Sequence, residues 1–471
     1  MWIPSNSKRS AGGWLLGALA AVSLGAAAPA SANSFVYATQ ISATGAGSVA
    51  QFVVGAGAGL LQLPFPPAPS GVSPEAVAVT PDGNNAYVAD GGTTAISQYS
   101  INPSTGALSP KAPDQVAAGV GPVDIAVSPG GLDAYVPAIH GISQYDIDPS
   151  TGALVAKLPD FVSTGGQPAR VAISPDGRSV YVTSFNSSSV FQFDVDPQTG
   201  DLTPKPHASV PAGNGPLGIT VTPDGKSVYV TNTNDNTVSE YNVDPKTGAL
   251  SAKPTPTIIT GRAPDAVAVT PDGHHAYVAN FGDNSLVRFA IDPSTGALTL
   301  GRLARTATGN HPRRVLIAPD GKSLYVASDN TINQYDIGIN GALTPKSPPT
   351  VEAAPLTSGM AIAKPTLNFR CLSCVTNVNV SPAASAGALI TGHLGVVESV
   401  GIVIARFTDG RFVRVGRVPL GHHRQGRLRI LWNLDVTDHK LPQGRYLITL
   451  RAFDNHQRVI AVAHPMPLTI P

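Results

Sequence analysis

The 471-residue sequence has only two cysteines, and after residue 32 it has no segment long and apolar enough to span a bilayer. Sustained helical spacing is also absent. The motifs His-Glu-x-x-His and Gly-x-Ser-x-Gly and the phosphate-binding loop do not occur, which excludes the enzyme classes that depend on them. The sequence therefore predicts an all-β protein with no metal, no cofactor and no transmembrane segment in the mature chain.

The cysteine pair forms the motif Cys371-Leu372-Ser373-Cys374 within residues 366–378, which we interpret as a linker. A redox motif would require a helix N-terminus in a βαβ setting, and a zinc site would require two further ligands nearby. We expect a local disulfide between Cys371 and Cys374. Reduced or intermolecular cysteines are the alternative.

The first 32 residues differ in composition from the rest of the chain. Lys8 and Arg9 precede an apolar run from Trp14 to Ala28, and small residues follow up to Ala32. This order is typical of a secretory signal peptide that is cleaved before Asn33. We therefore expect a secreted or cell-envelope protein. A retained membrane anchor is the alternative, but the run is short and rich in glycine and alanine.

A sequence repeat of about 48 residues recurs along the chain. Its anchor, Pro-Asp-Gly, supplies a tight turn, and a second turn of the form Asp-Pro-x-Thr-Gly follows later in each unit. Each unit contains four short β-like runs, which we label strands a to d, as in one blade of a propeller. The repeated aspartates resemble calcium loops only superficially, because each turn offers a single carboxylate.

The number of blades follows from the Tyr-Val pair of strand b. It occurs seven times, at Tyr37, Tyr87, Tyr135, Tyr181, Tyr229, Tyr277 and Tyr325. Only six of these have a strand a before them, and a seventh candidate, Met360 to Ala363, comes after the last blade. Pairing this strand with the segment around Tyr37 would leave no open edge. The sequence predicts a seven-bladed β-propeller over residues 33–365, closed by a C-terminal strand.

Candidate site residues come from the loops that vary between units. The constant turns all lie on one face of a propeller, so the variable d–a and b–c loops gather around the channel mouth on the other face. The candidates for ligand binding there are Glu75, Asp124, His140, Arg170, Asp265, Arg313 and Arg314. They fit an anionic or polyhydroxylated ligand, with arginine forks for carboxylate or phosphate. A solvated or internally paired surface is the alternative.

The repeat resembles two known groups of propellers. Tyr229-Val230-Thr231-Asn232 matches the bacterial YVTN-type repeat, and the turn sequence Asp-Pro-Ser-Thr-Gly-Ala-Leu is similar to that of the propeller lactonase family. That family includes 6-phosphogluconolactonase and the carboxymuconate-cyclising enzymes. The similarity covers residues 35–365. It implies the propeller fold and, for a catalytic member, hydrolysis of a lactone or sugar acid derivative at the mouth.

The chain departs from the pattern of the enzymatic members, which carry Pro-Arg-His, Asn-Glu and His-x-His motifs near the mouth. Pro312-Arg313-Arg314 keeps the arginine without the histidine, and Pro122-Val123-Asp124 stands where His-x-His is expected. No unit keeps an acid–base pair that matches the family's, and lactone chemistry requires one. His140 and Arg170 are the candidate catalytic residues if the chain is an enzyme.

The tail after the cysteines loses the repeat and becomes basic. Residues 366–471 carry a net charge of +7, against −8 for the repeat region. Alternating strands continue there, and the motif from Leu441 to Tyr446 resembles bacterial immunoglobulin-like modules, so we predict a small β-sandwich over residues 379–471. Its arginines, such as Arg411 and Arg414, fit an anionic wall polymer, but we favour a solvated sheet face or docking to the acidic propeller. Nucleic acid is not an expected partner.

Two hypotheses follow for the function. The first is an exported, non-catalytic propeller that binds an envelope protein, a polymer or an anionic ligand at or outside the cell envelope. The alternative is a lactonase-type hydrolase that resembles 6-phosphogluconolactonase and acts on a lactone or sugar acid at the propeller mouth.

Overall fold

The computed structural model describes residues 34–42, 44–55, 59–164, 166–353 and 359–363, together with the backbone of ten strands between 375 and 470. The predicted signal peptide and the pair Cys371 and Cys374 lie outside the described residues. No helix in the described part is long and apolar enough to cross a membrane.

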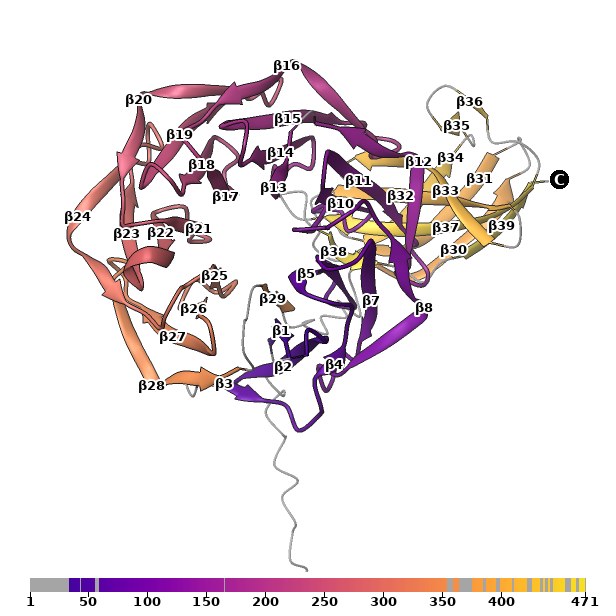
Figure 1. Ribbon diagram of the computed structural model, residues 1–471. Coiled ribbons are helices and arrows are strands. Elements are labelled where there is room, and N and C mark those ends of the chain that lie inside the picture. The colour runs from indigo at the N-terminus through magenta and orange to yellow at the C-terminus, as the bar shows by residue number, and fades with distance from the viewer. Residues whose placement is uncertain are drawn as a thin grey trace, which may run out of the picture. The chain divides into compact units, whose positions relative to one another are not determined.

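Seven antiparallel blades, six of four strands and one of five, form a closed ring (Figure 1), which confirms the predicted fold. Blade 1 combines β29 (Met360–Ala363) with β1 (Phe35–Ile41), β2 (Gly47–Gly55), β3 (Gly59–Gln62) and the short β4 (Ala68–Pro69). In this blade Tyr37 pairs with Ala361 and Phe35 with Ala363. The predicted closure of the ring by a C-terminal strand is therefore confirmed.

The remaining six blades follow in chain order, each with its innermost strand a first. Blade 2 contains β5 (Pro74–Val79), β6 (Asn85–Asp90), β7 (Ala95–Ile101) and β8 (Leu108–Ala117). Blade 3 contains β9 (Ala126–Val127), β10 (Asp133–Ala138), β11 (Gly141–Ile147) and β12 (Leu154–Ser163). Blade 4 contains β13 (Pro168–Ile173), β14 (Ser179–Ser184), β15 (Ser189–Val195) and β16 (Leu202–Pro211). Blade 5 contains β17 (Pro216–Val221), β18 (Ser227–Asn232), β19 (Thr237–Val243) and β20 (Leu250–Ile259). Blade 6 contains β21 (Pro264–Val269), β22 (His275–Asn280), the 3-10 turn η1 (Phe281–Asp283), β23 (Ser285–Ile291) and β24 (Leu298–Ala307). Blade 7 contains β25 (Arg314–Ile317), β26 (Ser323–Ala327), β27 (Thr331–Ile337) and β28 (Leu343–Glu352).

The two repeated turns fold as their residues predict. In blade 5, Gly225 and Gly248 adopt positive φ values of 72° and 66°, which glycine accepts without steric strain. The carboxylate of Asp244 accepts hydrogen bonds from the backbone N–H groups of Lys246 and Thr247, at 2.9 and 2.8 Å. These aspartates thus serve the turns, and the turn interpretation is confirmed.

Neighbouring blades are joined by a hydrogen bond that recurs around the ring. In six blades the strand-b tyrosine is buried and its hydroxyl donates to a glycine carbonyl in the c–d turn of the next blade. Tyr229, for example, donates to the Gly296 carbonyl over 2.6 Å. The aromatic rings pack in the apolar clusters between blades. The repeated tyrosine is therefore both a core residue and a specific link between blades.

Ten strands beyond the propeller form separate sheets. One contains β30 (Val375–Ala383), β31 (Gly387–Leu394) and β34 (Gly426–Trp432); another contains β32 (Ser399–Thr408), β33 (Arg411–Gly421), β37 (Gly444–Phe453), β38 (Val459–Val462) and β39 (Met466–Ile470); and β35 (Asp435–Val436) pairs with β36 (His439–Lys440). Thr408 pairs with Arg411, as expected for a hairpin between them. The immunoglobulin-like module itself stays a prediction.

The link between blades can be tested by comparing two tyrosines. Tyr229→Phe removes the bond to Gly296, so we expect the free energy of unfolding to fall by about 1–2 kcal/mol, as for other buried hydrogen bonds. Tyr325→Phe is the matched control, because the buried Tyr325 hydroxyl has no partner among the described residues. Urea unfolding monitored by far-ultraviolet circular dichroism measures both, and equal losses would contradict the proposed role of the bond.

Candidate functional site

The channel mouth is built by the first residues of the innermost strands. In β5, β13, β17 and β21 a proline begins the strand, where its missing N–H removes no ladder bond, and a one-residue bulge follows. A threonine of the adjacent strand stabilises the bulge in two of these blades. Thr183, for example, accepts from the N–H of Arg170 at 3.0 Å and donates to the Leu217 carbonyl of the next blade at 2.8 Å.

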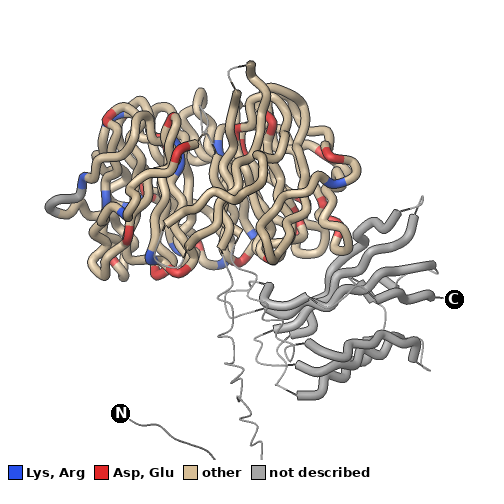
Figure 2. Tube along the Cα trace, turned by 90° about the horizontal axis from the view of Figure 1, so that it is seen from below, with Lys and Arg blue, Asp and Glu red and all other residues tan. Residues whose placement is uncertain are grey.

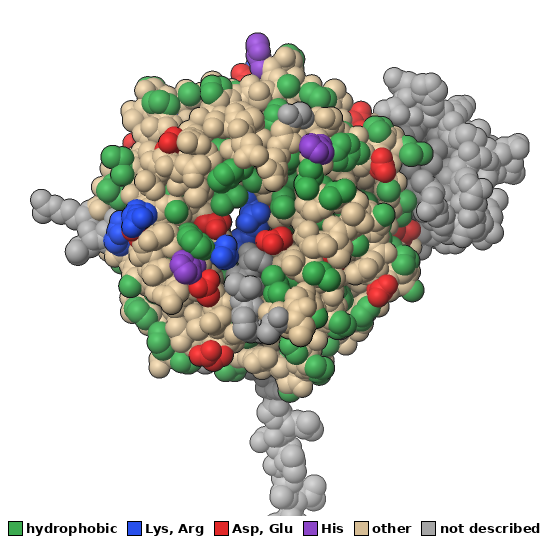
Figure 3. Space-filling view, viewed as in Figure 1, with side chains coloured by type: hydrophobic (Ala, Val, Ile, Leu, Met, Phe, Trp, Pro, Cys, Tyr) green, Lys and Arg blue, Asp and Glu red, His purple; other side chains and the backbone are tan. Residues whose placement is uncertain are grey.

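Six of the seven predicted residues come together at this mouth. Charged side chains of both signs gather around the central opening in the space-filling view (Figure 3), and the edge-on view shows charged positions mainly along the two faces of the ring (Figure 2). Five blades supply these six residues, which interact electrostatically with one another: Glu75, Asp124, Arg170, Asp265, Arg313 and Arg314. We call this group the mouth cluster.

An ion pair crosses the channel within the mouth cluster. Arg314 of blade 7 lies 3.2 Å from Asp124 of blade 3, and their side chains are only 17% and 13% exposed. The other carboxylate oxygen of Asp124 accepts from the N–H of Val171 in blade 4, at 3.1 Å. Arg170 donates from Nη1 to the carbonyl of Val123 at 3.0 Å. These contacts tie three blades together and hold the arginines in place.

Asp265 is the most deeply buried acid of the mouth cluster, at 6% exposure. Burial raises the pKa of its carboxyl, and Arg170, Arg314 and Arg313 oppose this rise. Its Oδ1 has no hydrogen-bond partner among the described residues, and neither has Nε of Arg170. Buried polar atoms are nearly always paired, so an unpaired acceptor and an unpaired donor in one cluster mark the place where a ligand can complete the network.

The family follows from the sequence of the ring. A family model described as "Lactonase, 7-bladed beta-propeller" matches residues 66–261 and 190–350. The chain belongs to this lactonase family. The resemblance noted from the repeat motifs is thereby confirmed, and the variable face of this lactonase-family ring carries the mouth cluster.

Solved structures share the fold of this lactonase-family chain. The periplasmic gluconolactonase of Pseudomonas aeruginosa aligns with a TM-score of 0.60 and 20% identity, over 70% of this chain and 98% of that one. A candidate 6-phosphogluconolactonase from Bacteroides fragilis aligns with a TM-score of 0.61 and 19% identity, over 71% and 99% of the two chains. No protein with a curated description matches in sequence. At these identities the likeness concerns the fold.

His140 is the one candidate that the structure does not join to the mouth cluster. It occupies the tight turn between β10 and β11 with a φ of 76°, and its side chain is exposed. Among the described residues, no hydrogen bond, ion pair or ring contact links its imidazole to the other six candidates. Its expected catalytic partnership with Arg170 stays a prediction.

A second histidine, which the sequence analysis did not select, lies beside the mouth cluster. The His311 ring stacks on Phe281 with 4.4 Å between ring centroids, and the guanidinium of Arg313 lies over the same phenyl ring at 4.7 Å. His311 Nδ1 is 2.6 Å from the carboxylate of Asp329. One signal was available in the sequence. The residue before the strand-a proline is not titratable in the other repeats, where Ser73, Gly121, Gln167, Gly215 and Ala263 occur.

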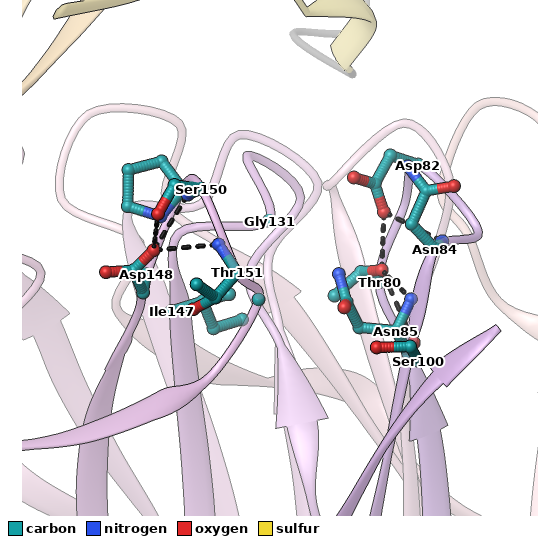
Figure 4. Close-up of a pocket in the computed structure, with 12 residues that line it drawn as sticks. Thr80, Asp82, Asn84, Asn85, Ser100, Gly131, Ile147, Asp148, Ser150 and Thr151 are labelled. Carbon is teal, nitrogen blue, oxygen red and sulfur yellow. Dashed lines mark hydrogen bonds between the residues drawn. The ribbon is translucent and has the colours of Figure 1, made fainter. Parts of the chain in front are cut away.

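The opposite face carries a hollow between blades 2 and 3 that is not a second site (Figure 4). Its carboxylates are already engaged, since Asp148 accepts from the N–H groups of Ser150 and Thr151, both at 2.8 Å. Lys111 bridges the two blades by donating to the Thr151 carbonyl at 2.6 Å. Equivalent lysine contacts recur at three further blade junctions, from Lys157, Lys205 and Lys253. The hollow is therefore one copy of a repeated structural seam.

Asp90 at the end of β6 is a structural acid whose ionisation destabilises the fold. It is fully buried, accepts from Ser97 Oγ at 2.7 Å and from the Gly71 N–H at 3.0 Å, and burial raises the pKa of its carboxyl to about 6. The equivalent Asn232 donates to Ser239 Oγ at 2.8 Å. Asn280, at the same position in blade 6, accepts from the Gly261 N–H at 2.9 Å, so asparagine can make corresponding contacts here without a charge.

We expect Asp90→Asn to stabilise the protein at pH 8 by about 1–3 kcal/mol. The pKa of Asp90 is higher in the folded state than in the unfolded state. The stability that the protonated carboxyl contributes is therefore complete below about pH 4 and is lost as pH rises through about 6. The gain of the variant should thus vanish at pH 4. Urea midpoints at pH 4, 6 and 8 measure this gain.

Asp244→Asn serves as the control of opposite sign. Backbone N–H groups of Thr247 and Lys246 lower the pKa of Asp244, so the carboxylate stabilises the turn above the ordinary pKa of an aspartate. This variant should lose stability at pH 8 and little at pH 3. A pH-independent effect of Asp90→Asn would contradict the assigned ionisation.

Proposed function

We propose that this lactonase-family protein binds a lactone or the corresponding sugar acid at the mouth cluster and hydrolyses the lactone. The main support is Oδ1 of buried Asp265, which has no hydrogen-bond partner among the described residues and lies beside three arginines, so it has hydrogen-bonding capacity for a ligand. Family membership supports lactone chemistry over a purely structural role. The expectation of a non-catalytic binding module is accordingly the less supported of the two sequence-based hypotheses.

The charges of the mouth cluster suit an anionic, polyhydroxylated ligand. Three arginines face three carboxyl groups, and when Asp265 holds a proton the cluster has one positive charge in excess. A protonated Asp265 also has an O–H to donate to a ligand hydroxyl or carboxylate. Arginine forks bind carboxylates through paired hydrogen bonds. A sugar acid presents both kinds of group on one small molecule.

Hydrolysis of a lactone requires that its carbonyl be polarised and that a water molecule lose a proton. The guanidinium groups of Arg313 and Arg314 are suited to stabilising the oxyanion that forms when water attacks the carbonyl carbon. Asp124 is poorly suited to accept the proton from water, because one oxygen pairs with Arg314 and the other accepts from Val171. The base must therefore come from another residue at the rim.

Two measurements test the proposal. Hydrolysis of glucono-δ-lactone and of a carboxylated γ-lactone is measured by pH-stat titration and compared with the spontaneous rate. Binding of gluconate is measured by calorimetry. We expect Arg313→Gln to lower gluconate affinity by about 10-fold or more, as for loss of a charge-assisted contact of 1.5–3 kcal/mol. Asp265→Asn makes this side chain uncharged at every pH, so it should preserve gluconate binding and remove any pH dependence of the affinity that comes from Asp265.

Lys322→Met is the matched control, since it removes an exposed cation from a turn on the opposite face. It should leave both binding and hydrolysis unchanged. Binding without hydrolysis of any lactone would favour the non-catalytic hypothesis. Failure of the wild-type protein to bind gluconate and to hydrolyse either lactone would overturn the proposal as a whole.

We also propose that the protein acts outside the cytoplasm, at the cell envelope or in the medium. The support is the signal-like order of residues 1–32, with its basic start, apolar run and small residues before Asn33. Mass spectrometry of the protein from the culture medium and the envelope fraction tests this. We expect a mature chain that begins at Asn33, and a full-length chain confined to the cytoplasm would refute the proposal.

A further inference from the structure

Four side chains from two blades form an ordered array beside the mouth cluster. Phe281 contacts both the guanidinium of Arg313, 4.7 Å from its ring centroid, and the imidazole of His311, 4.4 Å away and inclined by 23°. Arg313 in turn interacts with buried Asp265 of the mouth cluster. The imidazole and a guanidinium of the mouth cluster therefore pack on the same aromatic ring.

The backbone of His311 is held in an unusual conformation. Its φ is 50°, a positive value that recurs at this position in four other blades, at Ser73, Gly121, Gly215 and Ala263, with φ between 47° and 66°. A side chain in this left-handed region is disfavoured relative to glycine. The His311 N–H donates to Oδ1 of Asn284 at 2.8 Å, which helps to stabilise the turn. The fold thus presents an imidazole where glycine would suffice for the turn.

Asp329 orients the imidazole. Its carboxylate lies 2.6 Å from His311 Nδ1, and the backbone N–H of Asp329 donates to the Asn310 carbonyl at 3.0 Å. An ionised carboxylate accepts a hydrogen bond from Nδ1–H, so the neutral ring carries its proton on Nδ1 and has a lone pair on Nε2. The His311 side chain is 48% exposed, so water can reach the ring.

We propose that His311, oriented by Asp329 and stacked on Phe281, is the general base for lactone hydrolysis at the mouth. This inference rests on the proposed function. Nε2 removes a proton from water as the water oxygen attacks the lactone carbonyl carbon, and the carbonyl electron pair moves to an oxyanion beside Arg313. The intermediate then breaks the ring C–O bond, and the imidazolium returns its proton to the departing ring oxygen. The product is the open hydroxy acid.

The chain contains a matched His–Asp pair on the opposite face. His274 Nδ1 lies 3.3 Å from Asp272 in an a–b turn, and both side chains are more than half exposed, at 63% and 61%. No described aromatic ring stacks on His274. It therefore has the same two residue types without the stacked ring and without the neighbouring arginines.

The test compares His311→Gln, Asp329→Asn and His274→Gln in the mature chain, with glucono-δ-lactone as the substrate. We expect His311→Gln to lower kcat by about 100-fold or more, which is typical for loss of a general base, while KM changes less than about threefold. Asp329 is a positioning residue, and Asp329→Asn should lower kcat by at least about 10-fold. His274→Gln should behave as the wild type.

Nitrogen-15 NMR of the histidine rings gives a readout that a merely structural role would not move. We expect His311 to hold its proton on Nδ1 in the wild type and on Nε2 in Asp329→Asn, because the asparagine amide can donate to Nδ1. Urea midpoints check that each variant folds. If the wild type hydrolyses the lactone and the kcat of His311→Gln equals that of His274→Gln, His311 is not the general base, while the proposed function stands.

Two further outcomes are distinct. If Glu75→Gln abolishes hydrolysis and His311→Gln does not, Glu75 is the base and His311 is not. If the wild type binds gluconate and hydrolyses no lactone, the hydrolytic part of the proposed function fails and the assignment of His311 fails with it.

Discussion

The pairing of β29 with β1 is the contact on which the rest of the propeller depends. It joins segments about 320 residues apart, and beside the ladder Gly359 donates to Thr39 Oγ1 at 2.7 Å. Without this pairing β1 would present an open edge, and the innermost strands would not be held in a closed ring. A Cβ on Gly359 would lie 2.7 Å from Ala76 Cα, so the absence of a side chain lets blades 1 and 2 approach closely.

Once the ring is closed, the repeat separates stability from specialisation. Buried tyrosines, strand-c glutamines and seam lysines repeat nearly the same contacts at several junctions, as the Gln98, Gln144 and Gln192 bonds to the next strand d illustrate. The residues after the strand-a proline take little part in these contacts. The same backbone position can therefore hold Asp124 in one blade, Arg170 in another and Gly218 in a third without loss of the blade.

Much of the mouth could be predicted from the sequence, because residues at the same position of each repeat occupy the same place in each blade. Glu75, Arg170 and Asp265 were placed at the channel by this rule alone, and they lie there. His311 was missed because its significance depends on Phe281 and Asp329, which belong to loops of two different blades. The d–a candidates were chosen among the residues after the strand-a proline, so the residue before it was not selected.

The sequence by itself determined the number of blades, the turns and the closing strand, because these follow from local preferences repeated at a fixed period. Only the tertiary structure decided that Asp124 pairs with Arg314 across the channel and that Asp265 is buried with an unpaired oxygen. Coulomb energy and desolvation depend on distances and solvent exposure in three dimensions, which the period of a repeat does not specify.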